Sequence, residues 1–376
     1  MVLLFGSSAL VVWVAVLLLP WQPHRTRERI EADAAADDDL SGVAVVIPAR
    51  NEAAVIAQTL AALTRQGTGL QVIVVDDQSD DRTAQVCARA AAECGHHPIS
   101  LRVIDGAPLP AGWAGKPWAL QQGFASVERP YTLLLDADID LASGLLPALL
   151  SFARARQADL VSIMAQLHCE HVWERLLAPP FVLFFKLLYP FALVNDPCSP
   201  TAAAAGGCML IRTQALRDAG GFAAIRGALI DDCALAATLK KSRAAIWLGL
   251  SHSVRSVRGY DRLADFWSMV SRSAFTQLRY STLSLLGVSL AMGIVFIAPL
   301  ASLSAGLPGV LIGAGALLAM SVAYVPVVRF YRLPLLWTLM LPLAAVLFLA
   351  MTWSSAFNYW RGTRATWKNR AYEAAD

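Results

Sequence analysis

Two short acidic clusters follow directly after apolar runs in the N-terminal half of the chain, and they constrain its fold strongly. One run ends in Asp76-Asp77-Gln78-Ser79, and the other ends in Asp136-Ala137-Asp138. Each run is too short to be anything but a buried strand. Carboxylates at the ends of parallel strands face the crevice in which open α/β sheets bind ligands. The two clusters therefore predict a parallel sheet with an acidic ligand site.

The patterns around these runs alternate between strands and helices from residue 42 to about residue 260. The predicted strands cover Val43–Ile47, Leu70–Val75, Ile99–Ile104, Tyr131–Leu135 and Leu160–Ala165, and the predicted helices cover Glu52–Arg65, Asp81–Cys94, Lys116–Val127 and Gly144–Arg156. Ser79 is the expected N-cap of the second helix. Such alternation predicts an α/β domain whose mostly parallel sheet is covered by helices on both faces.

The chain is more apolar than a soluble enzyme, and the excess lies near its two ends. Hydrophobic residues make up 56% of the 376 positions. The uncharged run Leu3–Leu19 is near the lower limit for spanning a bilayer, and Arg25, Arg27 and Arg29 follow it. Charge after the run favours an uncleaved anchor, residues 1–21, with the arginines in the cytoplasm. An acidic, alanine-rich linker, residues 22–41, comes next.

Three apolar stretches within residues 282–360 predict C-terminal transmembrane helices. They cover roughly Leu283–Leu303, Leu307–Val328 and Leu335–Phe357. The positive-inside tendency places Arg329 and Arg332 in the cytoplasm, and simple alternation then places the tail, residues 361–376, on the other side. The tail is nevertheless basic, so either it is an exception or one stretch does not cross fully. Its basic residues include Arg361, Arg364, Lys368 and Arg370.

Two further segments predict helices at the membrane surface. Residues 178–194 are apolar, proline-bounded and carry Lys186, which favours an interfacial helix with a snorkelling lysine over a core helix of the α/β domain. Residues 261–281 contain an amphipathic pattern from Phe266 to Tyr280. The expected protein is a multi-pass protein of the inner (cytoplasmic) membrane, with its α/β domain, residues 42–260, facing the cytoplasm.

Charge and cysteine content narrow the possible partners. The net charge is +3, and charged residues make up 16% of the chain without a dense Lys/Arg block, so we expect no nucleic-acid partner. The six cysteines form no C-x-x-C pair and no zinc-type cluster. We therefore expect reduced, buried cysteines in a cytosolic domain. Protein partners are not predicted by any motif.

The second acidic cluster has the pattern of a cation site. Side chains two residues apart on a strand point the same way, so Asp136 and Asp138 are expected to act together. Hard oxygen ligands suit Mg²⁺ or Mn²⁺ bridging a diphosphate. Such an ion would neutralise the charge that develops on a departing nucleotide diphosphate.

Three other motifs are candidates for binding the rest of a nucleotide. The loop Pro48-Ala49-Arg50-Asn51-Glu52 joins the first strand to the first helix, where it can meet a ligand, although Asn51 could simply cap that helix. Asp76 and Asp77 can accept hydrogen bonds from a base or a ribose, or they could be a cap and a surface acid. Lys116 lies between glycine and proline at a predicted helix start, where a phosphate would be attracted.

Two segments are candidates for the chemical step and the acceptor. Asp231 and Asp232 begin a helical stretch, which favours acids electrostatically and also suits a general base for an acceptor hydroxyl. The Ala202–Gly207 segment before them is small enough for its backbone to approach a ligand. Arg279 could pair with a diphosphate and Tyr280 could stack on an acceptor, or this segment could be a basic interfacial helix on anionic lipid.

The order and spacing of these motifs resemble family 2 glycosyltransferases of the GT-A fold, from about residue 43 to residue 280. Within that family the chain looks most like the hopene-associated membrane glycosyltransferases of hopanoid biosynthesis. The segments that carry this likeness are Asp76–Ser79, Pro108–Trp113, Leu188–Pro197, Thr201–Leu210 and Ile225–Leu235.

The resemblance implies a role for each motif. Glu52 and Asp77 would hold the nucleoside, and Lys116 would lie near the base or the diphosphate. Asp138, helped by Asp136, would bind the metal.

The resemblance also implies the reaction. Asp232 would be the catalytic base of an inverting, direct displacement without a covalent intermediate. Related synthases end this domain with Gln-x-x-Arg-Trp, whereas here Gln277 is displaced by one position, Arg279 aligns, and Tyr280 replaces tryptophan. That departure favours transfer of a single sugar over processive synthesis.

We therefore expect transfer of one sugar from a nucleotide diphosphate sugar, with UDP as the expected nucleotide, to a hydroxyl of a membrane lipid such as a hopanoid. A polyprenyl-phosphate or ceramide-type acceptor is the nearest alternative. A catalytically silent scaffold in lipid biosynthesis is the alternative from another class.

Overall fold

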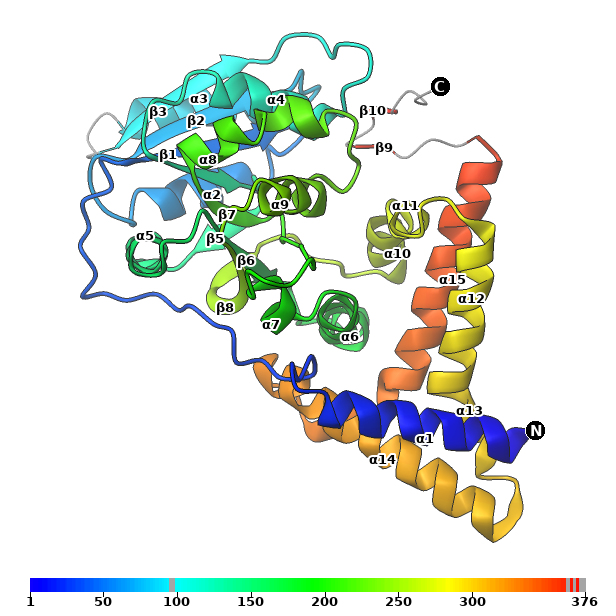
Figure 1. Ribbon diagram of the computed structural model, residues 1–376. Coiled ribbons are helices and arrows are strands. Elements are labelled where there is room, and N and C mark those ends of the chain that lie inside the picture. Colours follow the sequence, from blue (N-terminus) through cyan, green and yellow to red (C-terminus); the bar gives the residue numbers. More distant parts are fainter. Residues whose placement is uncertain (95–98, 363–365, 368–369, 372–376) are drawn as a thin grey trace. The chain divides into compact units, whose positions relative to one another are not determined.

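The chain divides into two compact units in the computed structural model, which describes residues 1–94, 99–362, 366–367 and 370–371 (Figure 1). The α/β unit contains Glu28–His168 and Leu193–Gly259, with residues 366–376 assigned to it as well. The membrane unit contains Met1–Arg27, Cys169–Ala192 and Tyr260–Ala365. Each unit is built from segments that are distant in the sequence.

An eight-stranded mixed sheet forms the centre of the α/β unit, in the order β3-β2-β1-β4-β7-β6-β8-β5. The strands are β1 (Val43–Ala49), β2 (Gln71–Asp76), β3 (Ser100–Asp105), β4 (Tyr131–Leu135), β5 (Ile139–Leu141), β6 (Leu160–Gln166), β7 (Cys208–Arg212) and β8 (Ile246–Ser256). Strands β3, β2, β1 and β4 are mutually parallel, whereas β7 is antiparallel to both β4 and β6. β6 and β8 are parallel, and β5 closes the edge antiparallel to β8. The predicted mostly parallel sheet is confirmed, with an antiparallel insertion that the patterns did not predict.

Helices cover both faces of this sheet because its inner strands are apolar on both sides. Val45 and Ile47 of β1 share one core cluster with α2 (Ile56–Leu63) and α5 (Leu145–Arg156). Helix α4 (Gly115–Phe124) packs on the opposite face. It approaches so closely there that a Cβ on Gly123 would lie 2.5 Å from Val46 Cγ1. The remaining helices of this unit are α3 (Thr83–Cys94), α8 (Thr213–Asp218), the 3₁₀ turn η1 (Gly221–Ile225) and α9 (Asp231–Lys241).

The segment expected to be a linker is partly a component of the α/β unit. Ile30 N–H donates to Leu250 O at 3.2 Å, and Leu250 N–H donates to Glu28 O at 2.9 Å, so this segment pairs with β8. Glu31 accepts hydrogen bonds from the backbone of His252, and Leu40 is fully buried. The part of the predicted linker from residue 28 onward therefore packs in the α/β unit. Only the part before residue 28 connects the two units.

The membrane unit contains three helical segments that are long and apolar enough to cross a membrane. They cover Thr282–Ser302, Gly306–Phe330 and Leu335–Trp360, and each end lies within three residues of the predicted one. The first comprises α12 (Thr282–Met292), a π-helical segment (Gly293–Ile297) and α13 (Ala298–Ser302); the second is α14 (Gly306–Phe330); the third comprises a 3₁₀ segment (Leu335–Met340) and α15 (Leu341–Trp360). The N-terminal helix α1 (Val2–Leu18) is apolar and shorter, with 17 residues.

Helix α1 lies along α14 and is held there by small residues (Figure 1). A Cβ on Gly6 of α1 would lie 3.3 Å from Ile312 Cγ2 of α14, and a Cβ on Gly309 of α14 would lie 3.4 Å from Leu3 Cδ2 of α1. Trp13 Nε1 donates to the carbonyl of Val295 at 3.0 Å. Close approach through small residues is how helices associate where no water drives them together, so α1 belongs to this helix bundle.

The prediction of a snorkelling lysine at 186 is wrong. Helix α6 (Val172–Leu188) begins before the predicted segment and carries Pro179 and Pro180 in its interior. The Lys186 side chain is only 1% exposed, and its Nζ lies 3.5 Å from the centroid of the Phe191 ring. Helix α6 packs on α14 and α15, with Phe184 edge-on to Phe348 at 5.1 Å. The lysine is thus enclosed within the membrane unit rather than directed to an interface. Phe191 begins the short helix α7 (Phe191–Val194).

The amphipathic helix predicted over residues 261–281 is also broken. It consists of α10 (Leu263–Ser271) and a single turn, α11 (Ala274–Gln277). Arg279 and Tyr280 have φ values of +52° and +56°, which L-residues avoid inside helices. Tyr280 stacks on Tyr359 of α15 at a ring-centroid distance of 4.4 Å. The chain turns sharply at Arg279 because this stacking and the start of α12 require it to reverse direction.

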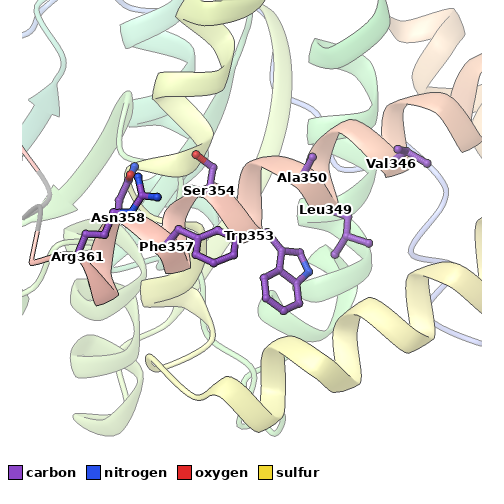
Figure 2. Close-up of a pocket in the computed structure, with 8 residues that line it drawn as sticks. All are labelled: Val346, Leu349, Ala350, Trp353, Ser354, Phe357, Asn358 and Arg361. Carbon is purple, nitrogen blue, oxygen red and sulfur yellow. The ribbon is translucent and has the colours of Figure 1, made fainter.

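A cavity of about 570 Å³ follows one face of α15 (Figure 2). Its lining changes character along the helix, from Val346, Leu349 and Ala350 at one end to Asn358 and Arg361 at the other. Trp353 lies in the middle and donates to the Ser289 hydroxyl of α12 at 3.0 Å. The cavity is therefore apolar over most of its length and polar at the end nearest the C-terminus of α15.

The described cysteines are free thiols, as expected: Cys87, Cys169, Cys198, Cys208 and Cys233. The expectation that they are buried is wrong for Cys198, which is exposed. The side chain of Cys94 and most of the basic tail, including Arg364 and Lys368, lie outside the described residues.

Candidate active site

The acidic clusters lie at one edge of the sheet because the strands before them end in register. Ala49 at the end of β1 pairs with Asp76 at the end of β2, and Asp76 pairs with Asp105 of β3. Strand β4, on the other side of β1, ends at Leu135, so Asp136 follows at the same edge. The carboxyl ends of these parallel strands thus bring together the Pro48–Glu52 loop, the Asp76–Ser79 cluster and the Asp136–Asp138 cluster, as expected.

The loops after β1 and β2 are bound to each other. Arg50 donates to the carbonyls of Asp77 at 2.5 Å and Gln78 at 2.8 Å. The backbone of Asn51 donates to Ser79 Oγ at 3.0 Å, and the hydroxyl of Ser79 donates to Asp76. Asn51 and Ser79 therefore do not cap α2 and α3. They fix the shape of a wall at this edge of the sheet, in which the Asp77 side chain is fully buried.

An ion-paired triad that the sequence did not reveal lies beside this wall. Arg258, two residues after β8, places Nε 2.8 Å from Asp138 Oδ2 and Nη2 2.6 Å from Glu52 Oε2. The Val257 N–H donates to the Asp138 carbonyl at 2.8 Å. The triad connects the loops after β1 and β4 to the end of β8. Arg258 was not predicted because β8 was not predicted.

Lys116 forms the second cationic centre of the edge. At the first turn of α4, its Nζ lies 2.7 Å from Asp136 Oδ1 and 3.5 Å from Asp231 Oδ2. Asp231 and Asp232 occupy the first turn of α9, as predicted. The Asp232 carboxylate accepts from the N–H groups of Gly206 at 2.8 Å and of Cys233 at 2.7 Å. Lys116 therefore joins Asp136 of the metal motif to Asp231, the neighbour of the predicted base.

The close backbone approach expected of the Ala202–Gly207 segment occurs at Gly206. A Cβ there would lie 3.1 Å from Lys116 Nζ and 3.2 Å from Asp232 Oδ2. The segment is held from the far end of α9, where Lys240 Nζ donates to the carbonyls of Val194 at 2.7 Å and Thr201 at 2.6 Å. Both ends of α9 thus fix the segment that orients Asp232.

Burial and mutual repulsion set the protonation behaviour of this cluster. Burial, followed by repulsion from Asp231, raises the pKa of Asp232 from 3.8 to about 6, although Lys116 and two backbone N–H groups act against the shift. Burial also raises the pKa of Asp136, and the nearby Asp138 adds to that rise. The pKa of Lys116 is raised because its attraction to Asp136 and Asp231 outweighs the burial that alone would lower it. Asp232 is thus a stronger base than an ordinary aspartate.

The composition of the cluster fits a divalent cation. In the part of the chain that the structure describes, carboxylates outnumber the two cations Lys116 and Arg258 in this network. The carboxylates are those of Glu52, Asp136, Asp138, Asp231 and Asp232. Burial raises the pKa of Asp136, and repulsion from Asp138 adds to the rise although Lys116 acts against it. Oxygen donors in an excess of negative charge are the donor set that Mg²⁺ and Mn²⁺ prefer.

The predicted site residues therefore fall into two groups. The α/β unit brings together the ion-paired cluster and, beside it, the wall that contains Pro48, Arg50, Asp76 and Asp77. The residues predicted for the acceptor or the diphosphate belong to the membrane unit: Gln277 donates to the hydroxyl of Tyr189, Tyr280 stacks on Tyr359, and Arg279 lies at the turn between them and α12.

The fold of the α/β unit and this acidic edge can be compared with those of known proteins. The α/β unit has the Rossmann-like GT-A architecture, with a mostly parallel mixed sheet whose carboxyl edge carries the acidic motifs. Residues 44–220 match the family model described as glycosyl transferase family 2. This match covers a little under half of the chain, and it makes residues 44–220 similar to family 2 glycosyl transferases. Asp231, Asp232 and Arg258 lie beyond the matched residues.

Two known proteins are similar in sequence to this chain over part of their length. The chain is 31% identical over 123 residues to 4,4'-diaponeurosporenoate glycosyltransferase of Staphylococcus haemolyticus. This match covers 32% of this chain and 31% of that protein. It is 32% identical over 120 residues to undecaprenyl-phosphate 4-deoxy-4-formamido-L-arabinose transferase of Pectobacterium atrosepticum, covering 31% of this chain and 35% of that protein. The chain thus matches about a third of the length of these relatives.

A solved structure resembles the chain over nearly its whole length. This is a mannosyltransferase from Pyrobaculum calidifontis, in complex with GDP-Man and Mn²⁺, with a TM-score of 0.53 and 17% sequence identity. The alignment covers 96% of this chain and 100% of that chain. At this identity the likeness defines the fold.

Proposed function

We propose that this protein is an inverting glycosyltransferase that moves one sugar from a nucleotide diphosphate sugar, with UDP as the expected nucleotide, to a hydroxyl group of a membrane lipid. The observation that carries the proposal is the Asp232 carboxylate. It is fixed by two backbone N–H groups, its pKa is raised to about 6, and Lys116 joins the neighbouring Asp231 to the Asp136 motif. A general base poised near the working pH is what deprotonation of a hydroxyl requires.

In this proposal Asp232 takes the proton of the acceptor hydroxyl while that oxygen attacks the anomeric carbon of the donor. The N–H groups of Gly206 and Cys233 hold the carboxylate in one orientation. Repulsion from Asp231 strengthens the base, since protonation of Asp232 relieves it. A single displacement of this kind inverts the anomeric configuration, and the described cluster needs no second nucleophile for it.

The departing nucleotide diphosphate needs positive charge. Asp138 and Asp136 would hold a divalent cation, which when bound would neutralise charge on the diphosphate. Lys116 adds a fixed positive charge between Asp136 and the base. The wall that contains Pro48, Arg50 and the buried Asp77 would bind the nucleoside.

The membrane unit supports a lipid acceptor. Three of its helical segments are suited to crossing a bilayer, and α15 carries a cavity that is apolar along most of its length with Asn358 and Arg361 at one end. Such a lining matches a hydrocarbon body with a polar head. The likeness of the motifs to hopene-associated enzymes makes a hopanoid or a similar polycyclic lipid the acceptor that we propose. The positive-inside tendency supports a protein of the inner membrane whose α/β unit faces the cytoplasm.

A polyprenyl phosphate is the second candidate acceptor, and the relatives favour it. The printed name of the Pectobacterium relative specifies undecaprenyl phosphate. A phosphate is already anionic, so it depends less on a base than a hydroxyl does.

Radiolabelled transfer distinguishes these candidates. The purified protein, in nanodiscs with Mn²⁺ and a UDP-[¹⁴C]hexose, would be given a total lipid extract, and separately undecaprenyl phosphate. We expect label in a neutral lipid product with the wild type and its loss with Asp232→Asn. The exposed Asp218→Asn variant is the matched control and should keep wild-type transfer. Equal transfer by wild type and Asp232→Asn would overturn Asp232 as the base, and label in undecaprenyl phosphate alone would replace the hydroxyl acceptor.

A further inference from the structure

Arg258 contacts one carboxylate oxygen of Asp138, the residue expected to bind the cation. Its Nε is 2.8 Å from Asp138 Oδ2, so this oxygen of the expected metal ligand is already engaged by a guanidinium. A carboxylate oxygen cannot accept a short contact from a guanidinium and coordinate an ion along the same direction. An ion that coordinates Oδ2 would therefore compete with Arg258 for Asp138.

The structure shows how Arg258 can release Asp138 without rearranging the fold. The neighbouring Val257 N–H is hydrogen-bonded to the Asp138 carbonyl, so the backbone is anchored independently of the side chain. A different atom of the guanidinium, Nη2, holds Glu52 at 2.6 Å. The Arg258 side chain is also 32% exposed, whereas that of Lys116 is 17% exposed and lies between two acids. Of these two cations, Arg258 has the freer side chain.

We propose that Arg258 is the internal counter-ion of the cation site. It neutralises Asp138 while no metal is bound, and it yields Asp138 to the incoming divalent cation while Glu52 retains the guanidinium. This inference rests on the proposed function only in requiring that a divalent cation bind at Asp138. Arg258 acts through Asp138 and Glu52 and is therefore a positioning residue.

Removal of Arg258 should change Mn²⁺ affinity in the direction opposite to removal of a residue that supports a metal ligand. Removal of Arg258 takes away the ion pairs that it forms with Asp138 and Glu52, so the metal-free protein loses stability. The same removal eliminates a competitor, so Mn²⁺ binds more tightly. Loss of one favourable ion pair, about 1.4 kcal/mol, corresponds to about tenfold tighter binding. Arg258→Lys keeps a positive charge and should stay close to the wild type.

Direct Mn²⁺ titration tests this inference without an activity readout. Free Mn²⁺ would be measured by electron paramagnetic resonance on the purified full chain, as wild type, Arg258→Gln, Arg258→Lys and Arg255→Gln. Arg255 is an exposed residue of β8 whose Nε donates to the His252 carbonyl, and it serves as the control for loss of charge. We expect Arg258→Gln to bind Mn²⁺ about tenfold more tightly and Arg255→Gln to match the wild type.

A melting experiment tests the folding consequence on the same proteins. In EDTA the Arg258→Gln variant should melt below the wild type, and Mn²⁺ should raise its Tm by more than it raises the wild-type Tm. Unchanged or weaker Mn²⁺ binding by a folded Arg258→Gln protein would overturn the inference. If sugar transfer still occurs in that case, the proposed function survives the failure. Absence of Mn²⁺ binding to every variant, together with sugar transfer in EDTA, would overturn both the inference and the cation at Asp138.

Discussion

The protonation of Asp232 should set the lower pH limit of sugar transfer. Its pKa is raised to about 6 by burial and by repulsion from Asp231. A base works only in its ionised form, so kcat/KM should rise with pH through about 6 and level off above 7. At pH 5 about one molecule in ten would carry the ionised base, which predicts about tenfold lower kcat/KM than at pH 8.

The assay must separate Asp232 from an acceptor that titrates in the same range. A phosphate monoester has its second pKa near 6, so a polyprenyl phosphate acceptor would also produce a limb there. Initial rates would therefore be measured from pH 4.5 to 8.5 with the wild type and with Asp232→Asn. For a hydroxyl acceptor the variant should lose about 10²–10⁴ in kcat/KM and should lose the limb with it.

Two results would refute this reasoning. A wild-type limb near pH 4 would mean that Asp232 behaves as an ordinary aspartate. A limb near pH 6 that persists in an active Asp232→Asn variant would assign the titration to the acceptor.

Four further outcomes follow from the same contacts. In EDTA, Asp232→Asn should melt at a higher temperature than the wild type above pH 6, and this difference in Tm should vanish below about pH 4. The reason is that the raised pKa of Asp232 lowers the stability of the wild-type fold as pH rises from the ordinary 3.8 to about 6. An equal Tm difference at both pH extremes would contradict this. Gly206→Val should lower kcat by about 10²-fold, since the new side chain begins 3.1 Å from Lys116 Nζ, and unchanged kcat would show that Lys116 can move freely. Lys240→Met should destabilise the α/β unit by about 2 kcal/mol in thermal unfolding, because two carbonyls lose their donor. The control Lys241→Met, at the exposed neighbouring position, should have no effect. Ala350→Trp should fill the α15 cavity and raise KM for the lipid without changing KM for the donor; equal effects on both would place the lipid elsewhere.

The parallel half of the sheet could be predicted from the sequence because its strands are buried on both faces. Such strands appear as continuous apolar runs, and β1, β2 and β4 were located to within two residues of their ends. The register of those ends then brings the predicted acids together without further information.

The other half depends on contacts that local patterns do not contain. Strand β8 includes the polar sequence Ser251-His252-Ser253, and it forms where residues 28–31, far away in the chain, pair with it. Because β8 was not predicted, its continuation to Arg258 could not be connected with Asp138. A signal was present nonetheless: Arg258 is part of a basic pair with Arg255 close to the end of the α/β unit.

Helix context explains the errors in the membrane unit. A lysine in an apolar, aromatic segment predicts snorkelling only if the helix faces an interface, and α6 is surrounded by other helices of its unit. The periodicity from Phe266 to Tyr280 is helical, but the positive φ values at Arg279 and Tyr280 are imposed by stacking on Tyr359. Neither constraint is visible in the local sequence.

The most direct measurement of the central claim is an experimental structure of the protein with UDP and Mn²⁺. We predict the uracil and ribose against the wall that contains Asp77, the diphosphate and the ion at Asp136 and Asp138, and Arg258 displaced from Asp138 but still paired with Glu52. Nucleotide bound away from the carboxyl ends of β1, β2 and β4 would contradict the assignment of this edge as the active site.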